Sequence, residues 1–371
     1  MSNFNENLSE AVVELPAVAL RRMCKLVRLL DRLSRHPGYR SLVYQNLPET
    51  ARFDPGHSAV MMCYDFHLTG DMPRLIEVNT NAGGSLLAYL SHNPTLPIRP
   101  ESLAPKMKAR LLRTFAAEMR QFSGGSKPRP ERIVIVDDEP IQQYLYPEMQ
   151  AFADLFREWG IPSEIAAPEQ LEASEEGVWL NDQAVDMVYN RHCDFFLESD
   201  ALAGLRKAYL AGKVCLTPNP HMYGLLADKR RMVLWTDPVK RAPYLTSDQD
   251  AVILDAVLPT SNILAELDLQ ETWAVRKQHV FKPVDSFGSR GVLLGGKISR
   301  KRFDELPLAT TLVQELVPPS VTEVPNFEPM KTDLRLYAYR DQVLGVTARL
   351  YRGQVTNLRT PGGGFARVKV L

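Results

Sequence analysis

The 371-residue sequence lacks the features that identify several large classes of protein. Its four cysteines stand far apart and form no C-x-x-C pair, which argues against a disulfide framework and against the common zinc-binding patterns. No apolar stretch approaches the roughly 18 residues of a membrane-spanning helix, and no basic segment followed by an apolar run opens the chain. We therefore expect a soluble, cytoplasmic protein with reduced thiols.

An excess of charge is also missing. Lysine and arginine number 44, as do aspartate and glutamate. This balance argues against nucleic acid or a membrane surface as a partner, because both favour a basic excess. Two phosphate-binding patterns are absent as well: no G-x-G-x-x-G follows the strand "RIVIVDD", and no G-x-x-x-x-G-K-[ST] occurs. At this length, two or three domains are expected.

The first part of the chain is predicted to be helical. Residues 11–35 repeat apolar positions at helical spacing with a basic opposite face, which favours an amphipathic helix packed on a core over a membrane-binding or partner-binding helix. Residues 1–55 are assigned to an N-terminal helical region. Another helix is predicted at 101–122, before a linker at 123–130.

A β-hairpin is predicted between these helices, in "AVMMCYDFHLTGDMPRLIEVNTN". With the hairpin centred near Asp71, Asp65 lies opposite Glu77, and Asn79 faces the same side. Two facing carboxylates repel each other and are costly to bury unpaired, so a divalent cation with oxygen ligands, Mg²⁺ or Mn²⁺, is expected there. The alternative is a solvated face with incidental acids, which the apolar neighbours disfavour.

The central region alternates buried strands with helices. "RIVIVDD", "IPSEIAAP", "AVDMVYNR" and "KVCLTPNP" have the character of strands, and helix-like segments separate them. This alternation predicts a small doubly wound parallel sheet, and hence an α/β protein.

Polar residues gather in three places in the last third of the chain. In "VFKPVDSFGSRGV", Lys282 ends an apolar strand and a glycine-containing loop follows, a combination that can bind phosphate oxygens. In isolation, a plain hairpin with an exposed lysine is the simpler interpretation. "LVQELVPP" runs to Gln314 and Glu315 and breaks at two prolines, as a hinge that hydrogen-bonds a flat heterocycle would.

The third place comprises Asp333, Arg335, Arg349 and Asn357, followed by "TPGGG". Guanidinium, amide and open glycine backbone suit a developing oxyanion or a transferring phosphoryl group. A single arginine of this kind is more often part of a surface ion pair. The occurrence of several such sets in one chain favours a common site.

As an ordered set, these motifs resemble the ATP-grasp superfamily, most closely its glutathione synthetase type. "DMVYNRHCDFFLESDALAGLRKAYLAGKVCLTPNPHMYGLLADKRRM" resembles that family's approach to its first ATP lysine. "VFKPVDSFGSRGV" resembles the second lysine and phosphate loop, and "LVQELVPP" the adenine hinge. "DLRLYAYRDQVLGVTARLYRGQVTNLRTPGGG" resembles the strands that carry an arginine and an asparagine.

In the family, a strand ending in E-x-N follows these motifs, whereas here "YDFHLTGDMPRLIEVNTNAGG" stands near the front. The resemblance therefore implies a circularly permuted ATP-grasp fold, as in glutathionylspermidine synthetase-like enzymes. It implies a metal-binding hairpin and helix that complete the ATP-grasp core (56–122), a Rossmann-like substrate domain (131–220) and nucleotide-binding subdomains (221–371).

The resemblance also implies roles for individual residues. Those expected to bind ATP are Lys229, Lys282, the loop residues Ser286, Gly288, Ser289 and Gly291, the hinge residues Gln314, Glu315 and Val317, and Asp333. Those expected to hold magnesium, as two ions that Mn²⁺ can replace, are Asp65, Glu77 and Asn79. Those expected to act on substrate are Arg349 and Asn357 in catalysis and Arg191 and Arg335 in binding. For Arg191 a structural ion pair is an equal alternative, and its neighbours His192 and Cys193 are expected to be structural. Phe287 and Arg290 depart from the smaller residues frequent in the family's loop.

The activity implied is ATP- and Mg²⁺-dependent ligation of a small carboxylate to an amine through an acyl phosphate. An ATP-grasp small-molecule kinase and a non-catalytic ATP-binding regulatory protein are the alternatives. Retention of Asp65, Glu77, Asn79 and Arg349 argues against the latter. A homodimer is a reasonable expectation.

Overall fold

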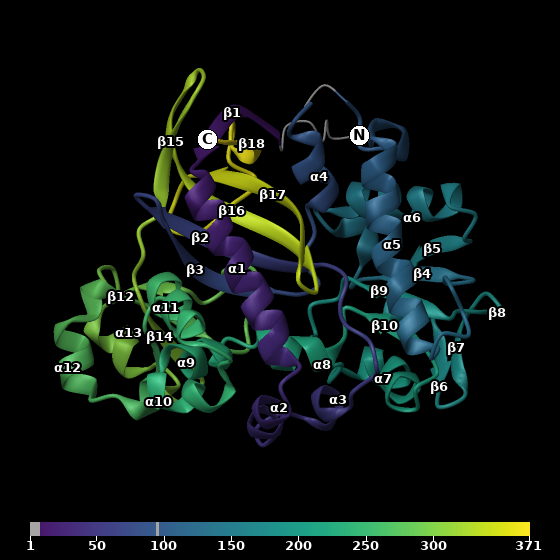
Figure 1. The fold of residues 1–371 in the computed structure, drawn as a ribbon, viewed down its shortest axis with the longest axis horizontal. Coiled ribbons are helices and arrows are strands. Elements are labelled where there is room, and N and C mark those ends of the chain that lie inside the picture. The colour runs from purple at the N-terminus through teal and green to yellow at the C-terminus, as the bar shows by residue number, and fades with distance from the viewer. Residues whose placement is uncertain (1–7, 94–95) are drawn as a thin grey trace.

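The computed structural model describes residues 8–93 and 96–371 and has a mixed α/β architecture (Figure 1). Its largest sheet has the strand order β1, β18, β17, β16, β2, β3, with β15 added beside β16. These strands are β1 (Leu8–Leu15), β2 (Met62–Thr69), β3 (Met72–Asn79), β15 (Ser320–Val324), β16 (Phe327–Tyr339), β17 (Gln342–Tyr351) and β18 (Gly364–Val370). Both ends of the chain therefore contribute to one sheet, since β1 pairs with β18 and β2 pairs with β16.

The N-terminal region was predicted to be helical, but it also contains a strand. Residues 11–15 belong to β1, and α1 (Ala17–Ser34) begins only after Pro16. Burial alternates along "LSEAVVEL", as expected of a strand with one buried face. Pro16 has no backbone N–H to donate and stands directly before the helix, so it separates the two elements. Residues 1–7 of the predicted region lie outside the described residues.

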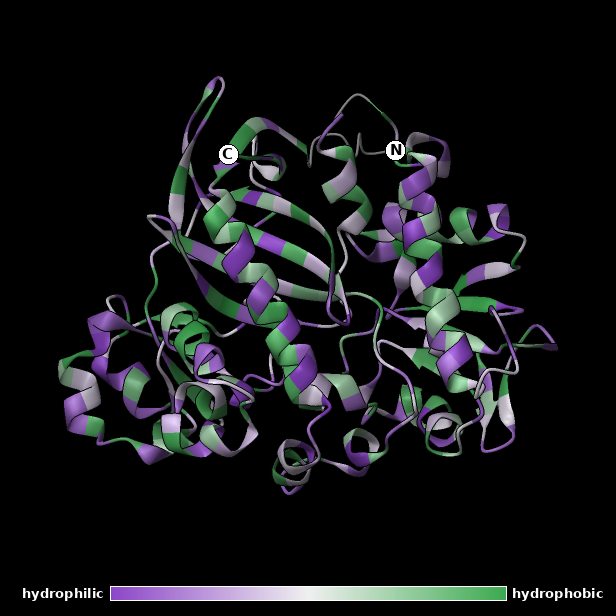
Figure 2. Ribbon diagram, in the orientation of Figure 1, coloured by the Kyte–Doolittle hydropathy of each residue, from purple (hydrophilic) through white to green (hydrophobic). Residues whose placement is uncertain are grey.

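The helix α1 covers one face of the largest sheet (Figure 1). Figure 2 shows hydrophobic and hydrophilic residues alternating along it. Its apolar residues Met23 and Leu26 enter a core that includes Phe66 of β2 and Leu336 of β16. The predicted packing of an amphipathic helix on a core is confirmed. Since side chains alternate along a strand, the residues next to Phe66 and Leu336 point to the opposite face.

The predicted hairpin is present as β2 and β3, and Asp65 pairs with Glu77 as predicted. The turn, however, lies at Gly70 and Asp71, because Thr69 pairs with Met72. A bulge at Ile76 absorbs the one-residue difference, since Phe66 pairs with Leu75 on its other side.

The predicted parallel sheet is also confirmed. Its strand order is β10, β9, β4, β5, with all neighbours parallel. The strands are β4 (Ile133–Val136), β5 (Ser163–Ala166), β9 (Met187–Asn190) and β10 (Cys215–Thr217). Ile133 and Ile135 share a core with α5 (Pro105–Phe122) and α6 (Tyr146–Glu158), while Val134 and Val136 share one with α7 (Ala203–Leu210). Helices therefore cover both faces, as in doubly wound sheets.

The helix α5, which was predicted to complete the ATP-grasp core, shares a hydrophobic core with both the parallel sheet and the largest sheet. Its residues Leu111, Phe115 and Met119 pack with Ile133 and Tyr189 of the parallel sheet. The carboxylate of Glu118 on the same helix accepts hydrogen bonds from His57 (2.8 Å), Thr217 (2.9 Å) and Tyr339 (2.8 Å). This buried network joins the parallel sheet to β16 of the largest sheet.

A third sheet is antiparallel, with the order β11, β14, β12, β13. Its strands are β11 (Ser261–Ile263), β12 (His279–Pro283), β13 (Leu293–Leu294) and β14 (Thr311–Glu315), and a small further sheet comprises β6 (Glu172–Ser174), β7 (Gly177–Leu180) and β8 (Gln183–Ala184). The remaining α-helices are α2 (Pro37–Tyr44), α3 (Glu49–Arg52), α4 (Ser85–Leu90), α8 (Pro220–Met222), α9 (Arg230–Thr236), α10 (Pro238–Arg241), α11 (Asp248–Val257), α12 (Leu269–Ala274) and α13 (Arg300–Asp304). No helix within residues 8–93 and 96–371 has the length and apolar character needed to cross a membrane.

Candidate functional site

The three larger sheets meet around a cavity of about 730 Å³. Most residues predicted to form a nucleotide site line it: Asp65, Glu77, Asn79, Arg191, Lys229, Lys282, Ser286, Gly288, Ser289, Gln314, Glu315, Val317, Asp333, Arg335 and Arg349. Gly291 and Asn357 are the predicted site residues that do not line it. Segments distant in sequence are thus brought together as the combined motifs predicted.

Four buried charges of alternating sign lie on the cavity face of β2, β16 and β17. Arg335 donates two hydrogen bonds of 2.7 Å to Asp65. Arg349 contacts Asp65 at 3.0 Å and also donates to Asp333 at 2.6 and 3.0 Å. All four side chains are at most 9% exposed. We call these residues, Asp333, Arg349, Asp65 and Arg335, the charge quartet; its formal charges sum to zero.

The charge quartet fixes the ionisation of Asp65. Burial would raise the pKa of this carboxyl, but the guanidinium groups of Arg335 and Arg349 outweigh burial and lower the pKa to about 2. Asn79 donates a further hydrogen bond of 3.1 Å to the same carboxylate. Asp65 is therefore an anion at any ordinary pH, and its oxygens are already used by three donors.

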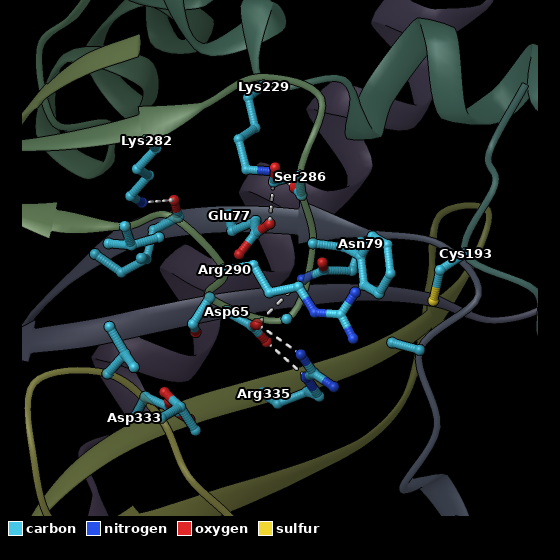
Figure 3. Close-up of a pocket in the computed structure, with 18 of the residues that line it drawn as sticks. Asp65, Glu77, Asn79, Cys193, Lys229, Lys282, Ser286, Arg290, Asp333 and Arg335 are labelled. Atoms are coloured by element: carbon cyan, nitrogen blue, oxygen red, sulfur yellow. Dashed lines mark hydrogen bonds and ion pairs between the residues drawn. The ribbon is translucent and has the colours of Figure 1, made fainter. Parts of the chain in front are cut away.

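Two lysines approach the cavity from the opposite side (Figure 3). Lys229 lies 3.4 Å from the carboxylate of Glu77 and also donates to the carbonyl oxygen of Ser286. Lys282 donates to Gln314 at 2.7 Å and to the carbonyl oxygen of Ile76 at 3.1 Å. Burial, helped by the nearby Lys229 charge, lowers the pKa of Lys282 to about 8, although Glu77 opposes the shift. This end of the cavity can accommodate an anion between two ammonium groups.

The loop after β12 borders the same space. Gly288 and Ser289 have φ values of 59° and 64°, and both line the cavity. The ring of Phe287 lies edge-on to Phe195, at 6.0 Å between centroids, and the Arg290 guanidinium lies over it at 4.7 Å. Arg290 lines the cavity and appears in Figure 3 among the residues around it. The two departures from the family's smaller loop residues therefore contact each other and give the loop a cation.

Gly291 contributes to the backbone turn of this loop and not to the cavity wall. Its φ is 70°, and a Cβ there would lie 2.7 Å from the ring of Pro283. The residue allows the chain to turn back against β12, and it does not line the cavity.

The predicted hinge lies at the end of β14, with Gln314 and Glu315 in the strand and Val317 just after it. The Val317 carbonyl accepts a hydrogen bond of 2.7 Å from His67, and Glu315 pairs with Arg74 at 2.7 Å. Ile76, Val280 and Leu294 supply apolar surface beside it. The sequence had not indicated His67 or Arg74, because their contacts cross from the hairpin to a segment about 240 residues away.

At its other end, the cavity reaches the carboxyl ends of β4 and β9. Arg191, the predicted substrate residue, is buried and donates to Glu148 (3.4 Å) and to the carbonyl oxygen of Asn81 (3.2 Å). Glu148 also accepts from the backbone N–H of Gly84 and Leu86. The guanidinium thus holds the loop after β3 in place, which favours the structural alternative. Asp137 lines this end as well and was not predicted, although it directly follows the buried strand "RIVIV".

The structure does not bring Asn357 to the site. This residue is exposed, and its side-chain oxygen accepts a hydrogen bond of 3.0 Å from the backbone N–H of Arg359 within its own turn. Thr356 instead points inward and donates to Asp333 at 2.7 Å. The amide predicted to act beside Arg349 therefore stabilises a turn.

The donor set fits a nucleotide-bound magnesium ion only in part. Within the described chain, no three His, Cys, Asp or Glu side chains are grouped as metal ligands would be. Mg²⁺ bound with a nucleotide usually takes one or two protein carboxylates and completes its shell with phosphate and water. Glu77, partly exposed in the cavity, fits this role, and Asn79 offers its amide oxygen beside it. Asp65 does not fit, because two arginines already bind it.

Comparisons with known proteins bear on the fold. No family model and no curated protein matches the sequence. Among solved structures, the chain is similar to one described as "Putative gamma-glutamylcysteine synthetase" from Methylobacillus flagellatus KT, with a TM-score of 0.53 and 14% identity over 96% of this chain and 89% of that chain. The two chains share a fold.

A second solved structure overlaps more weakly. It is described as "ATP-grasp ligase PsnB complexed with minimal precursor, Mg, and ADP", and it has a TM-score of 0.28 and 16% identity over 64% of this chain and 88% of that chain. This overlap is too weak to establish a common fold. Neither likeness bears on circular permutation.

The contacts of Asp65 give a prediction with a definite sign. Asp65→Asn is expected to lower the free energy of unfolding by roughly 3–5 kcal/mol at neutral pH, because it leaves the guanidinium groups of Arg335 and Arg349 short of a buried counter-charge. Thermal unfolding without metal or nucleotide measures the change.

The control is Asp71→Asn in the exposed hairpin turn, which should change stability by no more than about 0.5 kcal/mol. An Asp65→Asn protein more stable than the wild type would contradict the assignment. It would indicate that Asp65 and Glu77 are two mutually repelling carboxylates of a metal site.

Proposed function

We propose that the protein is an ATP- and Mg²⁺-dependent ligase that activates a carboxylate as an acyl phosphate and transfers the acyl group to an amine. One observation carries the proposal: two lysines, a glycine-containing loop, a hinge and the charge quartet line one cavity. Each motif alone has an ordinary structural explanation. Together they provide what phosphoryl and acyl transfer require, namely positioning and charge stabilisation.

The nucleotide is proposed to lie along the antiparallel sheet. Ile76, Val280 and Leu294 offer an apolar slot for the base beside the backbone at 315–317. The phosphates would then extend between Lys229 and Lys282, under the N–H groups of the loop 286–291. When bound, Mg²⁺ supplies charge neutralisation between the phosphates, and Glu77 and Asn79 are the residues proposed to hold it.

The reacting carboxylate is proposed to bind beside the charge quartet. Arg335 and Arg349 present guanidinium groups where the phosphates and the acyl carbon would meet, and Asp65 and Asp333 hold those groups in fixed orientation. No protein nucleophile is required. Cys193 lines the cavity, but burial raises the pKa of its thiol to about 12, so the thiolate is scarce at neutral pH.

The position of the hairpin supports the proposed circular permutation. β2 and β3 come from the first quarter of the sequence, yet β2 pairs with β16 and places Glu77 and Asn79 beside the residues of the C-terminal motifs. This is where the proposed permutation would put the E-x-N strand, although its order in the chain differs from that of the family.

A hydroxylamine trap tests the proposed reaction. The protein is incubated with Mg-ATP, hydroxylamine and a panel of amino acids, dipeptides and other small carboxylic acids. L-Glutamate is tested first because of the name of the structural neighbour. One acid is expected to yield a hydroxamate together with ADP, since hydroxylamine captures an acyl phosphate without the natural amine. Glu77→Gln should abolish this product by weakening Mg²⁺ binding.

Glu131→Gln, on an exposed side chain far from the cavity, is the matched control and should behave as the wild type. ADP accompanied by a phosphorylated product and no hydroxamate would support a kinase. Nucleotide binding with no ADP from any acid would support a regulatory protein. Full activity of Glu77→Gln would remove Glu77 from the metal site.

The lowered pKa of Lys282 gives a pH prediction for nucleotide binding. At pH 7 the ammonium is charged, and at pH 9, above its pKa of about 8, most of it is neutral. The affinity for Mg-ADP is therefore expected to fall by up to about tenfold between pH 7 and pH 9, as measured by calorimetry. An unfolded lysine keeps its proton up to a higher pH than folded Lys282 does. Between pH 7 and pH 9, Lys282 therefore makes the folded protein more stable as the pH rises. Weaker binding at pH 9 cannot then be attributed to unfolding linked to Lys282.

Lys282→Arg is the control for this measurement, because a guanidinium stays charged at pH 9. Its Mg-ADP affinity should vary less with pH than that of the wild type. Equal wild-type affinity at both pH values would show that the Lys282 charge does not bind phosphate.

A further inference from the structure

The carboxyl ends of β4 and β9 form the part of the cavity that the nucleotide proposal does not use. The strand order β10, β9, β4, β5 reverses between β4 and β9, because the chain leaves β4 toward β5 and then returns to the other side. Doubly wound sheets bind ligands at this topological switch point. Asp137 directly follows β4 there and lines the cavity.

Asp137 is held rigidly by its backbone. Its N–H donates to the carbonyl oxygen of Ala166, the last residue of β5 (3.3 Å), and the N–H of Arg191 donates to the carbonyl oxygen of Val136 (2.8 Å). Both flanking strands therefore fix the place from which the carboxylate enters the cavity. Such a position suits a group that must meet a ligand at a defined point.

The carboxylate of Asp137 is buried without a charged partner. The residue is only 8% exposed, and among residues 8–93 and 96–371 its one side-chain hydrogen bond comes from the adjacent N–H of Asp138 (2.9 Å). Arg191, the nearby cation, is engaged by Glu148 and Asn81 and forms no ion pair with it. Burial raises the pKa of Asp137 to about 6, against the pull of Arg191. An unpaired buried carboxylate is costly, and a cationic ligand would remove that cost.

The surroundings of Asp137 also favour a cation. Asp138 and Asp194 line the same end of the cavity. His192 lines it too, and burial lowers the pKa of that imidazole, which favours its neutral form. The phosphate end carries Lys229 and Lys282, whereas Arg191 beside Asp137 is already paired with Glu148.

On the basis of the ligase function proposed above, we propose that Asp137 binds the ammonium group of a primary-amine substrate and accepts its proton. The bound R–NH₃⁺ gives one proton to Asp137, and its nitrogen lone pair then forms the C–N bond with the acyl phosphate. The C–O bond to phosphate breaks with its electron pair on the phosphate. The second nitrogen proton leaves with the phosphate, and Asp137 returns its own proton to solvent.

Two acceptor amines separate this role from formation of the acyl phosphate. Hydroxylamine is largely uncharged at neutral pH and needs no base, whereas methylamine is present as methylammonium. With the acid selected by the trap, Asp137→Asn is expected to form hydroxamate within about twofold of the wild-type rate. Its kcat/KM for formation of the N-methylamide should fall at least about 100-fold, the lower range for loss of a general base. Asp182→Asn, in an exposed turn of the same region, should leave both reactions unchanged.

Wild-type N-methylamide formation by Asp137→Asn would overturn the assignment. Asp137→Glu keeps the carboxylate and should recover part of the methylamine reaction. An equal loss of both reactions in Asp137→Asn and in Asp137→Glu would therefore also overturn the assignment. The absence of hydroxamate from the wild-type protein with every acid would overturn the ligase proposal itself, and this assignment with it.

Discussion

The ion pair between Asp65 and Arg335 joins residues 270 positions apart and lies where β2 pairs with β16. This strand pairing places Glu77 and Asn79 in the same cavity as the lysines and the hinge. Burying a guanidinium and a carboxylate is costly unless each charge is matched and hydrogen-bonded. The charge quartet meets that condition by alternating sign from Asp333 to Arg335. Because these charges sum to zero, two arginines can stay buried at the centre of the site, held in place by their ion pairs.

The cavity has an ordered distribution of charge around this centre. Lys229 and Lys282 lie at the end bordered by the antiparallel sheet, and Asp137 lies at the end bordered by the parallel sheet. An anionic nucleotide, an acyl carbon and a cationic amine would fit this order from one end to the other. The charges that the three reactants would need therefore lie beside three different sheets.

Local sequence patterns were sufficient to predict the hairpin and the parallel sheet. Alternation and turn residues gave the hairpin and the Asp65–Glu77 pair, and alternating strands and helices gave the parallel sheet. By contrast, the contacts that change the expected roles of Asp65 and Arg191 join residues that are far apart in the sequence. The arginines around Asp65 come from β16 and β17, and the Glu148 that engages Arg191 lies on α6, so neither partner could be inferred from sequence spacing. Likewise, β1 was hidden because its alternation is short and precedes a strongly amphipathic helix.

A crystal structure with Mg²⁺ and a non-hydrolysable ATP analogue would test most directly whether this cavity is a nucleotide site. We expect phosphate oxygens within hydrogen-bonding distance of Lys229 and Lys282, the base beside Val317, and a magnesium ion on Glu77, with Asp65 still bound to Arg335. A nucleotide bound elsewhere, or a metal ion coordinated by Asp65 with its arginines displaced, would show that the cavity is not the proposed nucleotide site.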